Sequence, residues 1–147
     1  MYKRQVLIDA NILLYAVDED SPFHPQARRW LEGALNGPRR VGLPWQSLTG
    51  FMRIATNPRA VPNPLPPAGA WEMVEAWLDA RNSWIPQPGP GHREILGRLV
   101  RDLRLGANLI PDAALAALCI EHGLAVVSGD SDFARFTEVS WINPLTA

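Results

Sequence analysis

Four aspartates occupy positions from which their carboxylates could gather at one site. Asp9 directly follows a short apolar segment near the start of the chain, and Asp130 and Asp132 follow another near its end. Asp112 opens the helix-like run that leads into that second segment. Converging carboxylates repel one another unless protons or a divalent cation neutralise them. Because every candidate ligand atom is an oxygen, Mg²⁺ or Mn²⁺ is the favoured ion, and it could activate water against a phosphodiester.

Each of these aspartates also has a purely structural interpretation. Asp112 could be a first-turn aspartate that the helix dipole favours. Asp130 and Asp132 could be turn or N-cap residues of the following segment FARF. Asp9 is harder to explain in this way, because a carboxylate there ends an apolar strand. The joint placement of all four favours the site.

The elements that must position these residues alternate along the chain. Apolar runs and turn signals predict five short strands and six helical segments. The strands are expected at 3–8, 39–43, 83–85, 124–128 and 139–142. The helices are expected at 12–17, 21–35, 45–56, 67–81, 92–105 and 111–123. The alternation predicts an α/β fold with a mostly parallel sheet and helices on both faces. Ligands bind beyond the carboxyl ends of such strands, so Asp9 and Asp130 should share an edge if their strands are neighbours.

Length and composition narrow the class of protein. The chain has 147 residues, of which 47% are hydrophobic and 20% charged, so we expect a single globular domain spanning 1–147. The lone cysteine, Cys119, excludes a disulfide framework and lies in an Ala/Leu run typical of inert core. No apolar run approaches about 18 residues, and the first one is too short for a signal peptide. We therefore expect a cytoplasmic protein without a membrane span.

Arginine dominates the basic residues, since Lys3 is the only lysine among 14. A genome rich in G and C would explain this bias, but the arginine fork also suits phosphate recognition. Arg53 lies among apolar neighbours in the 45–56 helix, from which it could reach a phosphate or a carboxylate. Arg93, Arg101 and Arg104 fall on one face of the 92–105 helix, which is either an RNA contact or a solvated surface.

Other catalytic patterns are missing from the sequence. The three histidines lie in dissimilar contexts without metal-ligand spacing, so surface or structural roles are expected for them. No nucleophile elbow and no glycine-rich phosphate loop occurs. The six tryptophans fall mainly on apolar helix faces and are interpreted as packing residues.

The sequence resembles the PIN-domain ribonucleases, and specifically the VapC toxins of bacterial toxin–antitoxin pairs. Four segments in the family's order carry the resemblance: IDANILLYAVD (8–18), LPWQSLTGFMRIATNPR (43–59), NLIPDAALAALCIEHG (108–123) and VVSGDSDFARF (126–136). The resemblance implies an α/β/α sandwich of the PIN type and RNA cleavage that depends on Mg²⁺ or Mn²⁺. It also implies a homodimer that a small VapB-like antitoxin inhibits.

The family's acidic positions fall on Asp9, Asp112 and Asp130, which the resemblance assigns as metal ligands. It makes Asp132 an accessory catalytic acid. It also makes Asn11 and Ser128 polar supports of the cluster, while Arg53 would position the RNA backbone.

One acidic residue that the family usually has is absent from this chain. The usual glutamate of the middle helix, three residues before the arginine, falls on Gly50. No Asp or Glu occurs between Glu32 and Glu72, so a shifted alignment supplies no acid either. The hypothesis that follows is weaker metal affinity, or one bound ion instead of two.

Two other functions remain open at this point. The missing glutamate also permits a catalytically weak or inactive PIN-like protein that acts by binding RNA or an antitoxin. A phosphatase or receiver-like domain is less favoured, because the first strand lacks a D-x-D pair and no strand-end lysine is present.

Overall fold

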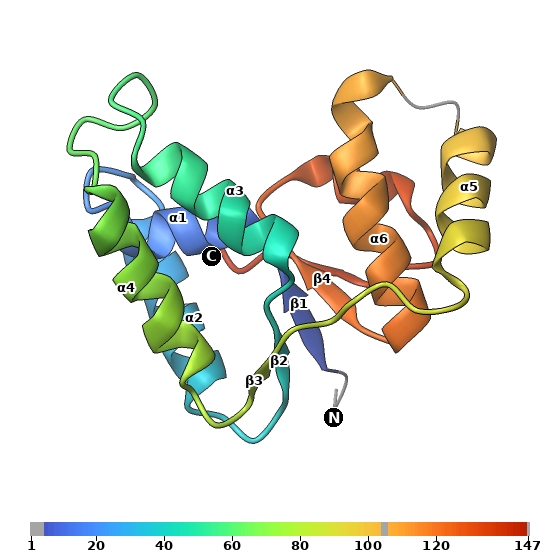
Figure 1. The fold of residues 1–147 in the computed structure, drawn as a ribbon, viewed down its shortest axis with the longest axis horizontal. Coiled ribbons are helices and arrows are strands. Elements are labelled where there is room, and N and C mark those ends of the chain that lie inside the picture. Colours follow the sequence, from blue (N-terminus) through green and yellow to red (C-terminus); the bar gives the residue numbers. More distant parts are fainter. Residues whose placement is uncertain (1–4, 104–105, 147) are drawn as a thin grey trace.

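A parallel β-sheet divides the molecule, as the computed structural model of residues 5–103 and 106–146 shows (Figure 1). Five strands lie in the order β3-β2-β1-β4-β5, and every neighbouring pair is parallel. Their bounds are β1 Val6–Ile8, β2 Val41–Gly42, β3 Ser83–Trp84, β4 Ala125–Val127 and β5 Trp141–Ile142. The central strands β1 and β4 pair in register from Val6 and Ala125 to Ile8 and Val127.

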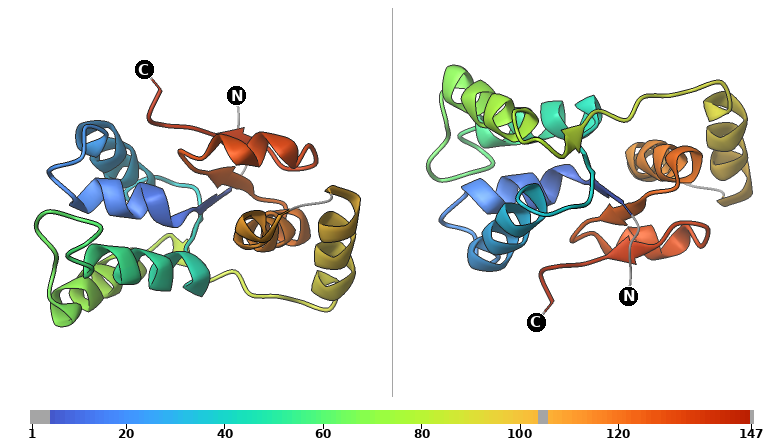
Figure 2. Two further views of the ribbon diagram at one scale, coloured as in Figure 1. Left: turned by 90° about the horizontal axis from the view of Figure 1, so that it is seen from above. Right: turned by 90° about the horizontal axis from the view of Figure 1, so that it is seen from below.

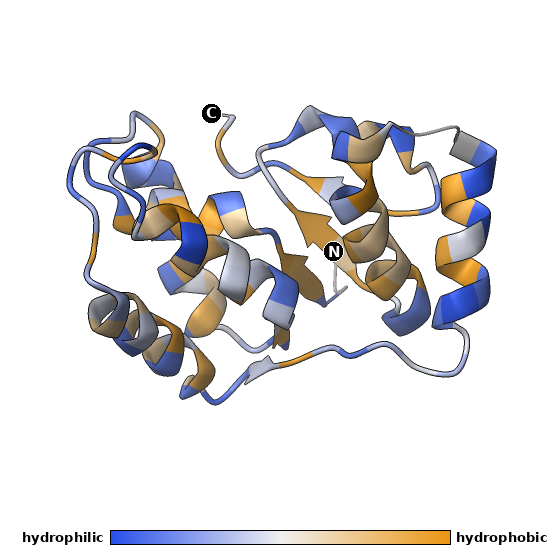
Figure 3. Ribbon diagram, turned by 45° about the horizontal axis from the view of Figure 1, so that its top comes forward, coloured by the Kyte–Doolittle hydropathy of each residue, from blue (hydrophilic) through white to orange (hydrophobic). Residues whose placement is uncertain are grey.

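Side chains of the central strands alternate between the two faces of the sheet, and both faces are buried. Val6 and Ile8 of β1 pack with Val127 of β4 in one core cluster. Leu7 and Val126 point the other way and belong to the second cluster. A sheet covered on both faces explains why these strands are apolar throughout, as their colouring in Figure 3 shows.

Helices cover each face in a separate layer. The first core cluster packs against α1 (Ala10–Val17), α2 (His24–Leu35), α3 (Trp45–Ala55) and α4 (Pro67–Leu78). The second packs against α5 (His92–Leu103), α6 (Ile110–His122) and the short 3-10 helix η2 (Ser131–Arg135), and a further 3-10 turn, η1 (Ala107–Leu109), leads into α6. The views from above and below show the two groups of helices on opposite sides of the strands (Figure 2). The expected α/β/α sandwich is confirmed.

The sequence patterns placed several element ends incorrectly. The helix expected from 21 begins at His24, because the Ser21 hydroxyl instead accepts a hydrogen bond from the Phe23 amide in the turn before it. The helix expected to reach 81 ends at Leu78, and the last strand starts at Trp141 rather than 139. Residues 3–4 of the first expected strand and 104–105 of the fifth expected helix, Arg104 included, lie outside the described residues.

No helix within the described ranges has the length and apolar character needed to cross a membrane.

Candidate metal centre

The carboxyl ends of β1 and β4 bring the first and last sequence motifs together. The Asp9 amide, directly after β1, donates to the Val127 carbonyl of β4 at 2.9 Å. Asp130 follows β4 at the same edge, so the two aspartates share an edge because their strands are neighbours. Both cap helices, since Asp9 precedes α1 and Asp130 precedes η2.

Hydrogen bonds from three groups hold the Asp9 carboxylate. Its Oδ1 accepts from the Ala10 amide at 2.7 Å, which caps α1. Its Oδ2 accepts from the Ser128 hydroxyl at 2.7 Å and from Asn11 Nδ2 at 3.1 Å. The carboxylate is therefore fixed in one orientation.

Ser128 connects the two strand ends and is fully buried. While its hydroxyl donates to Asp9, it accepts from Asn11 Nδ2 at 3.1 Å and from the Asp130 amide at 2.9 Å. The Asn11 Oδ1 in turn accepts from the Gly129 amide at 3.0 Å. Asn11 and Ser128 thus position acids from both motifs, as the resemblance implies for them.

Three carboxylates converge beside this network. Ligand oxygens of Asp112, Asp130 and Asp132 all lie within 4.8 Å of one another, and each side chain is partly buried. Asp112 lies in the first turn of α6, while Asp130 caps η2 by accepting from the Asp132 amide at 2.9 Å. Asp112 and Asp130 therefore occupy the helix-start positions considered from the sequence, and both also belong to the cluster.

The cluster concentrates negative charge, and the nearby cation is Arg135, whose Nε lies 3.8 Å from Asp132 Oδ1 at an exposed position. Burial, followed by the charges of Asp130, Asp9 and Asp132, raises the pKa of Asp112 to about 7. The pKa of Asp9 is also raised, chiefly by burial, although its hydrogen bond from Ser128 acts in the opposite direction. Mutual repulsion of this kind is what a divalent cation would relieve.

The compact triad contains three of the four acids expected at the site. The sequence predicts Asp9, Asp112 and Asp130 as ligands and Asp132 as an accessory acid, and the triad joins Asp112, Asp130 and Asp132. Asp9 still contributes its charge, because it raises the pKa of Asp112.

Helix α3 borders the acidic centre at two points. A Cβ atom added at Gly50 would lie 3.3 Å from the Ala10 Cβ, next to Asp9. Gln46, one turn earlier, donates from Nε2 to the Pro111 carbonyl at 2.8 Å, next to Asp112. Gly50 therefore occupies the side of α3 from which a glutamate would reach the cluster. Sequence patterns did not reveal the Gln46 bridge, because no periodicity shows what a helix face contacts.

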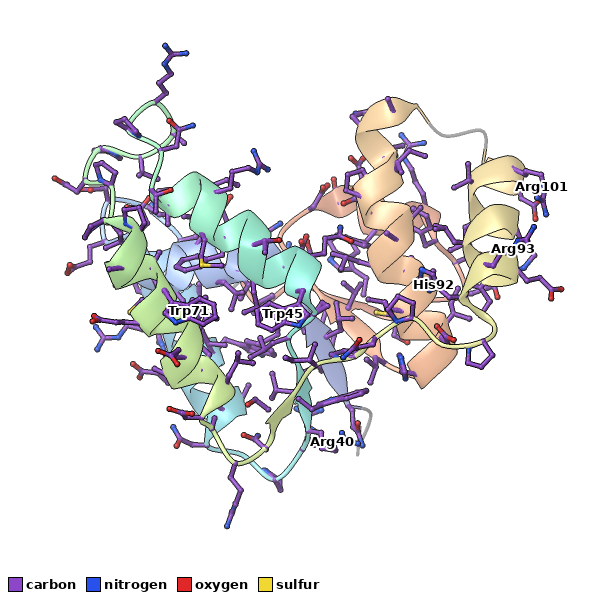
Figure 4. The ribbon with its side chains drawn as sticks, in the orientation of Figure 1. Arg40, Trp45, Trp71, His92, Arg93 and Arg101 are labelled. Atoms are coloured by element: carbon purple, nitrogen blue, oxygen red, sulfur yellow. The ribbon has the colours of Figure 1, made fainter. Side chains whose placement is uncertain are left out.

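Arg135 contacts the acidic centre through Asp132, whereas the arginines singled out from the sequence are exposed on α3 and α5. Arg53 is exposed in the last turn of α3, two turns beyond Gln46. Arg93 and Arg101 are exposed on α5, far to the right of α3 in Figure 4.

Histidines and the cysteine are structural groups. His24 Nδ1 pairs with the Tyr15 carbonyl at 2.9 Å, and His122 Nε2 with the Gln87 carbonyl at 2.8 Å. His92 lies 3.4 Å from Glu121. Burial raises the pKa of the Cys119 thiol to about 12, which keeps it protonated and inert.

Two tryptophans were assigned wrongly as packing residues. Trp77 is buried in the core, but Trp45 and Trp71 are each 42% exposed. Their indole rings lie parallel, at an interplanar angle of 6°.

Comparison with known proteins identifies the family. Residues 6–139 match the PIN domain family. Ribonuclease VapC37 of Mycobacterium tuberculosis is 46% identical over 138 residues, covering 94% of this chain and 96% of that protein. Ribonuclease VapC33 of the same species is 40% identical over 140 residues, covering 95% and 98%. The solved structure of VapBC2 from Rickettsia felis, bound to a promoter DNA fragment, has the same fold, with a TM-score of 0.70 at 14% identity, covering 95% of this chain and 98% of that one. The chain therefore belongs to the PIN domain family and, within it, to the VapC ribonucleases.

Proposed function

We propose that this VapC ribonuclease hydrolyses RNA phosphodiester bonds with Mg²⁺ or Mn²⁺ bound at the acidic centre. The observation that carries the proposal is the convergence of Asp112, Asp130 and Asp132 within 4.8 Å at the carboxyl edge of the sheet. The donor set is made of carboxylate oxygens alone, which suits these hard cations. Burial and the neighbouring carboxylates raise the pKa of Asp112 to about 7, and a bound cation would stabilise its ionised form.

The residues of the centre divide into ligands and groups that position them. Asp112 and Asp130 are the proposed central ligands, with Asp132 and Asp9 flanking them. When bound, the cation supplies positive charge to the scissile phosphate and promotes attack by water. Ser128 and Asn11 fix the Asp9 carboxylate, so that it does not reorient when substrate arrives.

Two further side chains are proposed to act on the RNA substrate or on the attacking water. Asp132 lies at the exposed start of η2, where it can bind the cation or orient the attacking water. Arg53 carries an exposed positive charge along α3 and is proposed to contact the RNA backbone.

RNA cleavage under controlled metal conditions tests this function. The purified chain should cleave unpaired RNA in Mn²⁺ or Mg²⁺ and should lose that activity in a chelator. The Asp9→Asn variant preserves the size of the side chain and should cleave far more slowly. If Asp9→Asn and the wild type cleave equally, or if neither cleaves any RNA tried, the nuclease proposal fails.

The proposed partners and compartment follow from the family. We propose that a VapB-like antitoxin binds the chain, that the chain forms a homodimer, and that it acts in the cytoplasm. Support for the antitoxin comes from the structural relative described as VapBC2. Co-expression with the protein encoded by a short neighbouring reading frame, followed by size-exclusion chromatography, tests both associations.

Gly50 supports a second candidate function. With glycine at this position, α3 supplies no acid to the centre, and a protein that binds RNA or antitoxin without efficient cleavage would have this composition. Retained RNA binding together with absent cleavage in both metals would favour this second function.

A further inference from the structure

Two exposed indoles with parallel rings lie where α3 and α4 meet. Trp45 begins α3 and Trp71 lies in the first half of α4, and their ring centroids are 6.5 Å apart. Figure 4 shows the two side chains next to each other. We call this pair the tryptophan shelf. Tryptophan side chains are largely buried on average, whereas these two neighbouring rings are each 42% exposed. The exposed apolar area favours a surface that binds a ligand.

The shelf is joined to the acidic centre through α3. Gln46, the residue after Trp45, donates to the Pro111 carbonyl next to Asp112. Successive residues of a helix point about 100° apart, so the Trp45 ring faces Trp71 of α4 while the Gln46 amide faces α6. The shelf therefore lies at the end of α3 that contacts α6, around the helix from that contact.

An exposed ridge continues from the shelf along α3. Trp45, Thr49 and Arg53 are spaced four residues apart and are all exposed, which places them along one ridge of the helix. Across from it, α4 exposes Glu72 and Glu75 beside Trp71. A polyanion is repelled from the α4 side and attracted toward Arg53, so its backbone would follow α3 while an uncharged ring rests on the indoles.

The surroundings of the shelf do not match a protein-binding surface. A stable protein interface buries roughly 800 Å² on each partner around an apolar centre. In the described part of the chain the other exposed large hydrophobic residues are Phe23, before α2, and Ile110, which precedes the Pro111 that Gln46 contacts. The residues near the two tryptophans along α3 and α4 include the polar Gln46, Thr49 and Glu72. An isolated pair of parallel rings among polar groups is instead the arrangement that stacks on a nucleobase.

We propose that the tryptophan shelf binds an unpaired nucleobase of the RNA substrate, next to the phosphate that is cleaved. This inference rests on the proposed function, because it supplies the substrate to the same centre. Stacking tolerates any base, since every base has a π-face. The shelf therefore selects single-stranded over paired RNA and sets the register of the strand against the acids.

Binding to a fluorescently labelled, unpaired RNA of about eight nucleotides tests the shelf. Anisotropy is measured with Ca²⁺ in place of Mg²⁺, so that binding is read apart from cleavage. Trp45→Ala and Trp71→Ala should each weaken binding by about 5-fold to 100-fold, whereas Trp45→Phe should retain most of the affinity. Phe23→Ala is the matched control, because Phe23 is 40% exposed on the loop before α2, and it should bind like the wild type.

Substrates with a single abasic nucleotide show whether a base is the group that is bound. Moving the abasic site along the RNA should reveal one position at which the wild type loses affinity and Trp45→Ala loses no more. Equal sensitivity of both proteins at every position would overturn the proposal. So would wild-type affinity in Trp45→Ala, or a change in its elution volume that shows the indoles joining two copies of the chain.

Failure of the shelf and failure of the nuclease function give different results. If the wild type cleaves RNA in Mg²⁺ and Trp45→Ala binds and cleaves equally well, only the shelf is wrong. If the wild type neither cleaves nor binds unpaired RNA, both proposals fall.

Discussion

The Ser128 hydroxyl donates to the Asp9 carboxylate at 2.7 Å, and this contact joins residues 119 positions apart in the sequence. It ties the end of β4 to the end of β1 at the edge where the acids gather. The same hydroxyl accepts from Asn11 and from the Asp130 amide, so one buried oxygen organises both acidic motifs.

Replacing Ser128 with alanine should destabilise the fold. The change removes one hydrogen bond each from the buried Asp9 carboxylate and the Asn11 amide, and it removes the partner of the Asp130 amide, at a cost of about 1–3 kcal/mol. Urea unfolding measures the loss. Ser131→Ala, at an exposed position three residues on, should change the free energy of unfolding by less than about 0.5 kcal/mol. Equal stability of the two variants would contradict the role given to Ser128.

The Asp112 carboxyl should make the metal-free protein less stable as pH rises. Its pKa of about 7 in the fold exceeds the 3.8 of an unperturbed aspartate, so between these values the folded chain binds a proton that the unfolded chain has lost. Stability from this group is therefore present below pH 3.8 and is lost as pH rises through 7. In a chelator, Asp112→Asn should have a higher Tm than the wild type at pH 8, and a smaller advantage at pH 5.

Adding Mg²⁺ at pH 8 provides the matched comparison. The cation should raise the Tm of the wild type and have little effect on Asp112→Asn. A Tm difference between the proteins that stays constant from pH 5 to pH 8 would contradict the charge repulsion assigned to the cluster.

Restoring an acid on α3 should strengthen metal binding. Gly50→Glu places a carboxylate next to Ala10, where the added Cβ requires a shift of a few tenths of an ångström. We expect the Kd for Mn²⁺ to fall by about 10-fold, the scale on which single groups around a metal act. Gly50→Gln introduces a side chain of the same size as Gly50→Glu without the charge, and it should leave the Kd for Mn²⁺ unchanged. Gly33→Glu on α2, where a Cβ meets nothing within 4 Å, controls for net charge.

Calorimetric titration with Mn²⁺ should find a single cation on each chain. The compact triad offers one set of converging oxygens, and Gly50 removes the acid expected to help hold a second ion. Asp112→Asn should abolish the binding heat. Tight binding of two ions in the absence of RNA would contradict this prediction.

Sequence patterns predicted the parts of the site that depend on the backbone. Asp9 and Asp130 could be placed at one edge because apolar strands precede them and parallel strands end together. The capping role of Asp130 was also predicted, since a carboxylate before a helix accepts its first free amides. The capping role of Asp9 was missed, because the helix was expected to begin at residue 12 and it begins at Ala10.

The same sequence patterns could not predict which residues of different helices contact each other. Helical spacing gives the direction of Trp45 and Gln46 around α3 but not what stands opposite them. Trp45 therefore has the spacing of a packing residue although it is exposed, and the Gln46 bridge to Pro111 depends on the packing of α3 near α6.

The rate of RNA cleavage in Mn²⁺ by Asp112→Asn, relative to the wild type, tests the central claim most directly. Asp79→Asn, an exposed aspartate at the end of α4, makes the same chemical change away from the centre. We expect Asp112→Asn to cleave about 100-fold more slowly or worse, and Asp79→Asn to cleave like the wild type. Wild-type cleavage by Asp112→Asn, with its fold intact, would contradict the central claim.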